Sequence, residues 1–179
     1  MKTLTSSWTT RIAPREYAVL FSRYACSSGL ILGQEKCISM IEEINFKLEQ
    51  LGEYVSTLRE YQPCDIEDIK NNRTLRGAVE RYMEISLACM IDICEMIISS
   101  EKLRRPDTYR EVILILGKHD ILPQEFAKKL APAAGLRNVL VHMYADIDLE
   151  KLYSHLQNDI DDLELFAEYV AKYLVSKYK

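Results

Sequence analysis

Glycine and proline are scarce in this sequence, with 6 glycines and 5 prolines among 179 residues. Such a low content of helix-interrupting residues argues against a fold built from many short strands and tight turns. No region alternates apolar and polar residues as a half-buried strand does. Because 48% of the residues are hydrophobic and 28% are charged, the sequence predicts a globular protein of long helices around a buried core.

Paired cysteines and membrane spans are also lacking. The number of cysteines is odd, and none forms a C-x-x-C pair, so neither a disulfide framework nor a zinc site is indicated: Cys26, Cys37, Cys64, Cys89 and Cys94. The most apolar stretch, residues 90–98, is interrupted by Asp92 and Glu95 and is too short to cross a bilayer. We therefore expect a cytoplasmic protein with reduced thiols, no metal and no membrane contact.

A net positive charge is absent as well. The chain carries −4 overall, and residues 1–39 contribute +3 because they hold five basic and two acidic side chains. The rest of the chain must then carry −7. A body this acidic excludes a protein that coats nucleic acid through charge alone. Any contact with RNA would need a local basic spot, and Lys102, Arg104 and Arg105 form one candidate.

Residues 1–37 differ from the rest, because they are rich in Ser, Thr and Arg and sustain no helical period. Three interpretations compete: a genuine N-terminal arm, a targeting segment, or upstream sequence preceding a true start at Met40. We favour the last, or a loosely attached arm. The predicted organisation is an N-terminal extension over 1–37 and a helical domain over 38–179.

Apolar residues recur every three or four positions from Ile38 to Leu58, which predicts a helix ending near Tyr61, before Pro63. After a linker over residues 65–72 comes a long second helix, on whose apolar stripe Asp92 also falls. That position predicts either a buried polar contact or a carboxylate at an interface.

Three further helices are indicated by their start and stop signals. Thr108 and Glu111 form a capping-box pattern, and Gly117 is a natural helix terminator. Pro123 suits the first position of a fourth helix, and Pro132 and Gly135 inside that helix predict a kink or a break. Asp148 should cap one long final helix. The fold class is therefore all-α, a four- to five-helix up-and-down bundle.

The stretch from Gly135 to Tyr144 gathers residues suited to phosphodiester chemistry. Arg137 offers a permanent cation with a planar fork of donors, and His142 can exchange a proton near neutral pH. Asn138 lies four residues before His142 and shares its helix face. Each residue also has an ordinary structural interpretation: an ion-paired surface arginine, a histidine at a helix C-terminus, and a tyrosine in the core for Tyr144.

Arg137 and His142 are five residues apart, so on a straight helix they point roughly 140° away from each other. They could act together only if the helix bends or ends between them, if the arginine reaches round, or if two chains pool their residues. The last possibility would make dimerisation part of the site.

The run Arg137-Asn138-x-x-x-His142-x-Tyr144 resembles the R-x4-H-x-Y motif of HepT toxins, a branch of the HEPN ribonucleases. The resemblance extends over roughly residues 40–173. It includes the Gly-Leu-Arg-Asn start of the motif, the Ile147-Asp148 step after it, and residues 106–109 before the third helix. Residues 1–37 have no counterpart in that pattern.

The resemblance implies a HEPN-like fold and a metal-independent endoribonuclease that needs no cofactor. The ribose 2′-hydroxyl would attack the neighbouring phosphorus, with His142 as general base or acid and Arg137 stabilising the extra negative charge. Asn138 would hold the phosphate or His142. The sites would lie in a cleft between the protomers of a homodimer, and transfer RNA and messenger RNA are both open as substrates.

The resemblance also implies regulation within a type VII toxin–antitoxin system. Tyr144 would be adenylylated by a partner nucleotidyltransferase of the MntA type, and the added nucleotide would block and repel RNA phosphate. Two supporting assignments have ordinary alternatives. Arg104 and Arg105 could bind substrate or merely lie at a solvated helix end. Asp92 could support the residues that line the cleft, or could be an ordinary buried polar contact.

Two other functions remain open. The chain could be a non-catalytic HEPN module that holds nucleotide or substrate for a nucleotidyltransferase, which the acidic body favours. It could also be a helical scaffold without a ligand, which would place the motif side chains in a dry core. A titrating imidazole beside an arginine favours the ribonuclease, because a binding module does not need one.

Overall fold

The computed structural model describes residues 32–142 and 147–177, without the side chains of residues 32–38 and His142. Every regular element in these ranges is a helix, labelled α3 to α10. The all-α fold class is therefore confirmed. No helix within the described ranges combines the length and hydropathy needed to cross a membrane.

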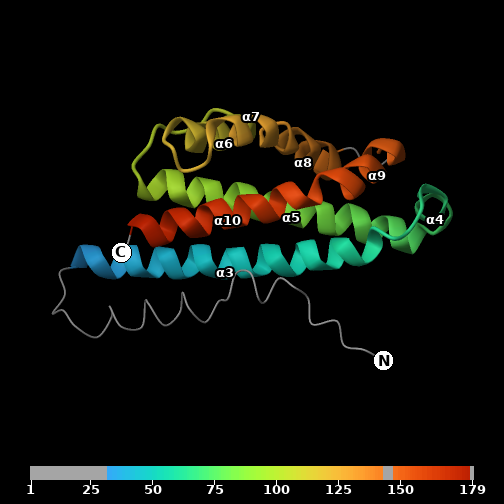
Figure 1. The fold of residues 1–179 in the computed structure, drawn as a ribbon, viewed down its shortest axis with the longest axis horizontal. Coiled ribbons are helices and arrows are strands. Elements are labelled where there is room, and N and C mark those ends of the chain that lie inside the picture. Colours follow the sequence, from blue (N-terminus) through green and yellow to red (C-terminus); the bar gives the residue numbers. More distant parts are fainter. Residues whose placement is uncertain (1–31, 143–146, 178–179) are drawn as a thin grey trace, which may run out of the picture.

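Three long helices form the body of the bundle (Figure 1). They are α3 (Leu32–Tyr61), α5 (Arg73–Ser100) and α10 (Ile160–Lys177). Both α5 and α10 run back along α3 and pack against it (Figure 1). The apolar stripe of α3 faces them, because Ile41, Ile44, Leu51, Val55 and Leu58 are all buried.

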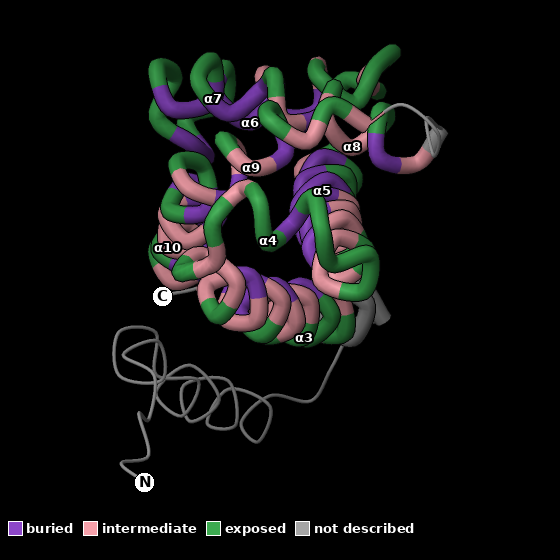
Figure 2. The backbone as a smooth tube through the Cα atoms, turned by 90° about the vertical axis from the view of Figure 1, so that its right-hand side faces the viewer, coloured by how far each residue is buried: buried purple, intermediate pink, exposed green. Residues whose placement is uncertain are grey.

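Three short helices form a second layer, on the side of the bundle away from α3 (Figure 2). They are α6 (Tyr109–Lys118), α7 (Gln124–Leu130) and α8 (Ala133–His142). Both α6 and α8 pack on α5 and touch each other. This layer carries the chemical motif of the sequence.

Two further short helices lie at one end of the bundle (Figure 1). These are α4 (Ile66–Asn71) and α9 (Leu149–Asn158), which pack against each other. The α4 segment was predicted to be a linker, and that prediction is wrong. A capping box, in which Asp65 and Asp68 bond each other's backbone N–H groups, starts the helix, and buried Ile69 anchors it.

Several predicted boundaries are confirmed. The first long helix ends at Tyr61, Pro123 precedes α7, and the chain breaks at Ala131 and Pro132 between α7 and α8. Asp148 caps α9 through a bond from the Lys151 backbone N–H. Helix α3 starts at Leu32, six residues before the predicted start. The helix therefore crosses the proposed boundary after residue 37. The division of the chain into an N-terminal extension and a helical domain stays a prediction.

Two local predictions are wrong. The single final helix is divided at Asp159 into α9 and α10. Gly117 does not terminate α6, because it lies inside that helix without a positive φ, and Asp120 adopts the left-handed conformation after its end. A Cβ atom at Gly117 would lie 2.6 Å from the Cβ of Ala127. Gly117 therefore serves the close packing of α6 on α7.

Candidate functional site

The candidate site is built on α8, which continues without interruption from Ala133 to His142. Ala134 and Leu140 are buried and fix the inner side of the helix, while Gly135, Asn138 and Val139 are exposed. At 100° per residue, the backbone position of His142 falls on the same outer side as these three residues. The motif therefore straddles α8, with Arg137 toward the bundle and the position of His142 toward the outside.

Arg137 is half-buried, and its guanidinium carbon lies 5.1 Å from the centre of the Tyr109 ring. Tyr109 is the first residue of α6, so this cation–π contact joins the two short helices at the surface. The ordinary interpretation of Arg137 as an ion-pair partner finds no support: in the described ranges no carboxylate lies within ion-pair distance of its side chain.

The geometry narrows how Arg137 and His142 could cooperate. Helix α8 does not end between them, and on a regular helix their positions lie roughly 140° apart. The guanidinium is also engaged on the side of α8 that faces α6. Of the three routes to convergence, a helix end between the two residues is excluded, and the pooling of residues from two chains stays a prediction.

Of the remaining motif residues, the structure describes Asn138 but not Tyr144. Asn138 is exposed on α8, available to solvent or to a ligand. Tyr144 lies outside the described residues, so its predicted modification is untested. The described ranges contain no cluster of three histidine, cysteine or acidic side chains arranged to hold a metal ion.

Arg104 and Arg105 lie in the exposed connection between α5 and α6. Arg104 forms ion pairs with Asp107 and Glu111, so two carboxylates compensate its charge. Arg105 is exposed, and in the described part of the chain no carboxylate pairs with it. The predicted basic spot therefore contains one compensated and one uncompensated arginine.

Asp92 is exposed on α5, and its carboxylate accepts a hydrogen bond from the Lys47 ammonium on α3 at 2.8 Å. The interpretation of Asp92 as a buried polar contact is therefore wrong, whereas its role at an interface stays a prediction. The hydrogen bond to Asp92 raises the pKa of Lys47. Burial raises the pKa of the neighbouring Cys89 thiol to about 11, so that cysteine is protonated and unreactive at neutral pH.

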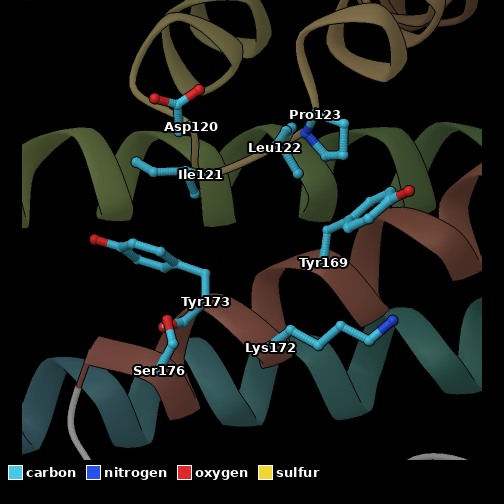
Figure 3. A pocket seen from close by; sticks show the side chains of 8 residues that line it. All are labelled: Asp120, Ile121, Leu122, Pro123, Tyr169, Lys172, Tyr173 and Ser176. Atoms are coloured by element: carbon cyan, nitrogen blue, oxygen red, sulfur yellow. The ribbon is translucent and has the colours of Figure 1, made fainter.

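A pocket of about 370 Å³ lies elsewhere, between α10 and the connection from α6 to α7 (Figure 3). The rings of Tyr169 and Tyr173 on α10 lie opposite Leu122 and Ile121 (Figure 3), and Lys172 of α10 also lines the pocket. It contains none of the predicted site residues, and it is not part of the candidate site.

Tyr109 contacts the candidate site, although its sequence position indicates only that it belongs to the segment before the third helix. The available signal was an aromatic side chain in the first turn of a helix that follows a basic cluster. Its contact with Arg137 depends on the packing of α6 against α8, which periodicity does not reveal.

Comparison with known proteins shows related sequences over most of the chain. The profile of a family described as "Ribonuclease HepT-like" matches residues 51–170. A tRNA nuclease HepT of Aphanizomenon flos-aquae is 31% identical over 133 residues, which cover 74% of this chain and 90% of that protein. An mRNA nuclease HepT of Shewanella oneidensis is 26% identical over 106 residues, covering 59% of this chain and 80% of that protein.

Solved structures share the fold at low sequence identity. The cytosolic protein YutE of Bacillus subtilis, described as of unknown function, superposes with a TM-score of 0.67 at 19% identity, covering 76% of this chain and 91% of YutE. A tri-AMPylated HEPN toxin of Shewanella oneidensis, solved in complex with its MNT antitoxin, gives a TM-score of 0.66 at 22% identity. That match covers 72% of this chain and 96% of the toxin.

Proposed function

Because this chain belongs to the HepT-like ribonuclease family, we propose that it is an endoribonuclease and the toxin of a type VII toxin–antitoxin system. The observation that carries the proposal is an arginine without a carboxylate partner in the described ranges, five residues before a histidine on one continuous helix. Two relatives named as HepT nucleases of tRNA and mRNA support RNA as the substrate class.

The proposed reaction needs only side chains and the substrate itself. The ribose 2′-hydroxyl attacks the adjacent phosphorus, the bond to the 5′-oxygen of the next nucleotide breaks, and a 2′,3′-cyclic phosphate remains. His142 takes the proton from the 2′-hydroxyl or delivers one to the leaving oxygen. Arg137 stabilises the additional charge on the phosphorane, and exposed Asn138 binds the phosphate or orients His142. No metal ion takes part.

The active form is a homodimer, with sites shared between protomers. The directions of the two side-chain positions support this, because α8 directs Arg137 toward α6 and places the backbone of His142 on its outer side. The outer side also carries Val139, which is 37% exposed, and a second copy would cover this apolar side chain. Arg105 and Arg104 extend the RNA-binding surface, and Asp92 supports the cleft from α5.

Regulation comes from a neighbouring enzyme of the MntA nucleotidyltransferase type. Adenylylation of Tyr144 places a phosphodiester charge and a bulky base two residues beyond His142, where both oppose an incoming RNA phosphate. The modified toxin of Shewanella oneidensis, described together with an MNT antitoxin, supports this part of the proposal. Toxin, partner and RNA would meet in the cytoplasm.

The ligand-free scaffold explains the structure less well. It requires motif side chains in a dry core, whereas Asn138 is exposed and Arg137 is only half-buried beside an exposed tyrosine. A non-catalytic HEPN module would equally present these groups to solvent. An RNA cleavage assay distinguishes the two, because only the ribonuclease would cut RNA.

Expression in a bacterial host tests the proposal. The intact chain should arrest growth, and His142→Ala or Arg137→Ala should relieve the arrest at equal protein level. His155→Ala and Arg81→Ala are matched controls, because these residues lie on α9 and α5 outside the motif; both should arrest growth as the intact chain does. Purified protein should cleave tRNA or mRNA in the presence of EDTA, leaving cyclic phosphate ends. Growth unaffected by the intact chain, and RNA left uncut, would contradict the ribonuclease.

Co-expression with the nucleotidyltransferase tests the regulation separately. Mass spectrometry should show AMP-sized additions that disappear in Tyr144→Phe, while Tyr153→Phe on α9 should retain them. Additions that persist in Tyr144→Phe would assign the acceptor to another residue.

A further inference from the structure

Tyr109 occupies a fixed position at the start of α6. Thr108 caps the helix by accepting a hydrogen bond from the Glu111 backbone N–H at 3.2 Å, and the Glu111 carboxylate accepts one from the Asp107 backbone N–H at 2.8 Å. At the other end of α6, Gly117 packs closely on Ala127 of α7. The ring of Tyr109 is therefore attached to a helix whose ends are both held.

That ring is nonetheless 38% exposed, and within the described ranges Phe46 is the only other aromatic side chain that is exposed. Core packing does not account for it. Within the described ranges the ring contacts the Arg137 guanidinium, whose central carbon lies 5.1 Å from the ring centre. A cation–π contact restricts the orientation of an arginine without occupying its N–H donors with a carboxylate.

A comparison with Arg104 shows what the ring contributes. Arg104 is held by the carboxylates of Asp107 and Glu111, which take up its donors and offset its charge. Arg137 is held by a neutral ring. An anion that approaches Arg137 therefore meets a full positive charge, whereas at Arg104 it must displace two carboxylates.

We propose that Tyr109 is a positioning residue of the ribonuclease site, whose ring orients Arg137 toward the phosphodiester without neutralising it. This inference rests on the proposed function and adds a residue from α6 to a motif that otherwise lies at and just beyond α8. The ligand class that the pair selects is an RNA phosphodiester, bound by a guanidinium already turned toward it. Ordering the guanidinium before substrate arrives serves the transition state more than the ground state.

Substitutions at Tyr109 separate the ring from the hydroxyl. Tyr109→Phe keeps the ring and should cleave RNA within about twofold of the intact protein. Tyr109→Leu and Tyr109→Gln lack the ring and should lower kcat about tenfold, with a smaller change in KM, which corresponds to the loss of one cation–π contact. Phe46→Leu is the matched control, because Phe46 is a 59% exposed aromatic on α3; its kcat should be unchanged.

A double-mutant cycle with Arg137→Ala tests whether Tyr109 acts through the arginine. In that background Tyr109→Leu should cost less than twofold further, because the group it positions is gone. A second tenfold loss would assign Tyr109 an independent role and overturn the inference. Thermal unfolding of each variant shows whether the folded protein is destabilised. A purely structural role for Tyr109 would require the loss of activity to be accompanied by a loss of folded protein.

NMR gives a readout besides activity. The side-chain Nε–H signal of Arg137, assigned by its disappearance in Arg137→Lys, should carry a ring-current shift that Tyr109→Leu removes and Tyr109→Phe retains. If the intact protein cleaves RNA and Tyr109→Leu cleaves equally fast, the inference fails while the proposed function stands. If the intact protein cleaves no RNA, both fail.

Discussion

Adjacent residues of the same type can differ in what they offer a ligand, as Arg104 and Arg105 show. Two carboxylates hold Arg104, and a phosphate would have to displace them before it could bind. Arg105 is exposed and, within the described ranges, has no such partners. The sequence could indicate a basic spot, but it could not indicate which of its charges is available, because that depends on how the chain turns into α6.

Removing each arginine separately should therefore have unequal effects on RNA binding. Arg105→Ala should weaken binding of single-stranded RNA and lower the slope of log Kd against log salt by about 0.7, the value for one lost phosphate contact. Arg104→Ala should change the slope less. The measurement is fluorescence anisotropy over a series of KCl concentrations, in the His142→Ala background so that the RNA stays intact. Equal slopes for both variants would contradict the distinction.

Glu101 illustrates how one carboxylate can join the ends of two helices. It follows the last residue of α5, and it pairs with Lys177 in the last turn of α10. Burial alone would raise the pKa of this carboxyl, but the hydrogen bonds from Lys177 and Tyr173 outweigh it and lower the pKa below its ordinary value. Burial and the same carboxylate raise the pKa of Tyr173.

This pairing should make stability depend on pH in acid. Because the pKa of Glu101 is lower in the folded chain, its stabilising effect is complete above its unfolded pKa, near 4.3, and is lost as pH falls through the folded value. Glu101→Gln should therefore lower the free energy of unfolding at pH 7, and its difference from the intact protein should shrink below about pH 4. Urea unfolding at several pH values measures this. Glu95→Gln, an exposed glutamate on α5, is the control, and a difference independent of pH would contradict the assignment.

At the scale of helices, periodicity predicted which side chains are buried better than it predicted where helices end. The inward residues of the final segment are buried on both sides of Asp159, as Leu156 and Ile160 show. The apolar periodicity therefore continues across the end of α9 and the start of α10, and it does not indicate that the helix is interrupted there. Helix α4 was missed for the opposite reason: it has six residues and one buried side chain, too few to establish a period.

The same limit explains the error at Gly117. In a sequence, a glycine that follows an apolar run predicts the end of a helix, where glycine adopts the left-handed conformation. The structure requires glycine there because α6 and α7 approach too closely for a side chain. Such a requirement arises between elements, and nothing in the local sequence of α6 contains it.

Close packing of α6 on α7 makes a specific prediction about stability. Gly117→Ala should destabilise the protein by about 1–3 kcal/mol, the usual cost of overpacking, since the new Cβ would meet Ala127 at 2.6 Å. Removing the opposing methyl group in the double variant Gly117→Ala/Ala127→Gly should recover part of that loss. Gly135→Ala is the control, because a Cβ there has open space around it, and it should not lower stability. Urea unfolding distinguishes these outcomes, and an unaltered midpoint for Gly117→Ala would show that the helices simply move apart.

For the whole molecule, the sequence was sufficient for the helical fold, and the geometry of α8 bears on how the residues of the motif could act together. Arg137 lies toward α6, and the backbone of His142 falls on the outer side of the same helix. A site that needs both groups at one phosphate would then draw them from different protomers. Two-fold symmetry would produce two equivalent sites in each dimer.

Mixing two inactive variants tests this shared site directly. In a dimer of one Arg137→Ala chain and one His142→Ala chain, one of the two sites has both defects, and the other has an intact arginine from one chain and an intact histidine from the other. After equal mixing and subunit exchange, about a quarter of all sites should be intact, so RNA cleavage should return to about a quarter of the activity of the unmodified protein. If both groups acted within one chain, every site would keep one defect and mixing would restore nothing. Two chains tagged differently and purified through both tags confirm that mixed dimers have formed, so a failure to cleave RNA would then assign the site to a single protomer.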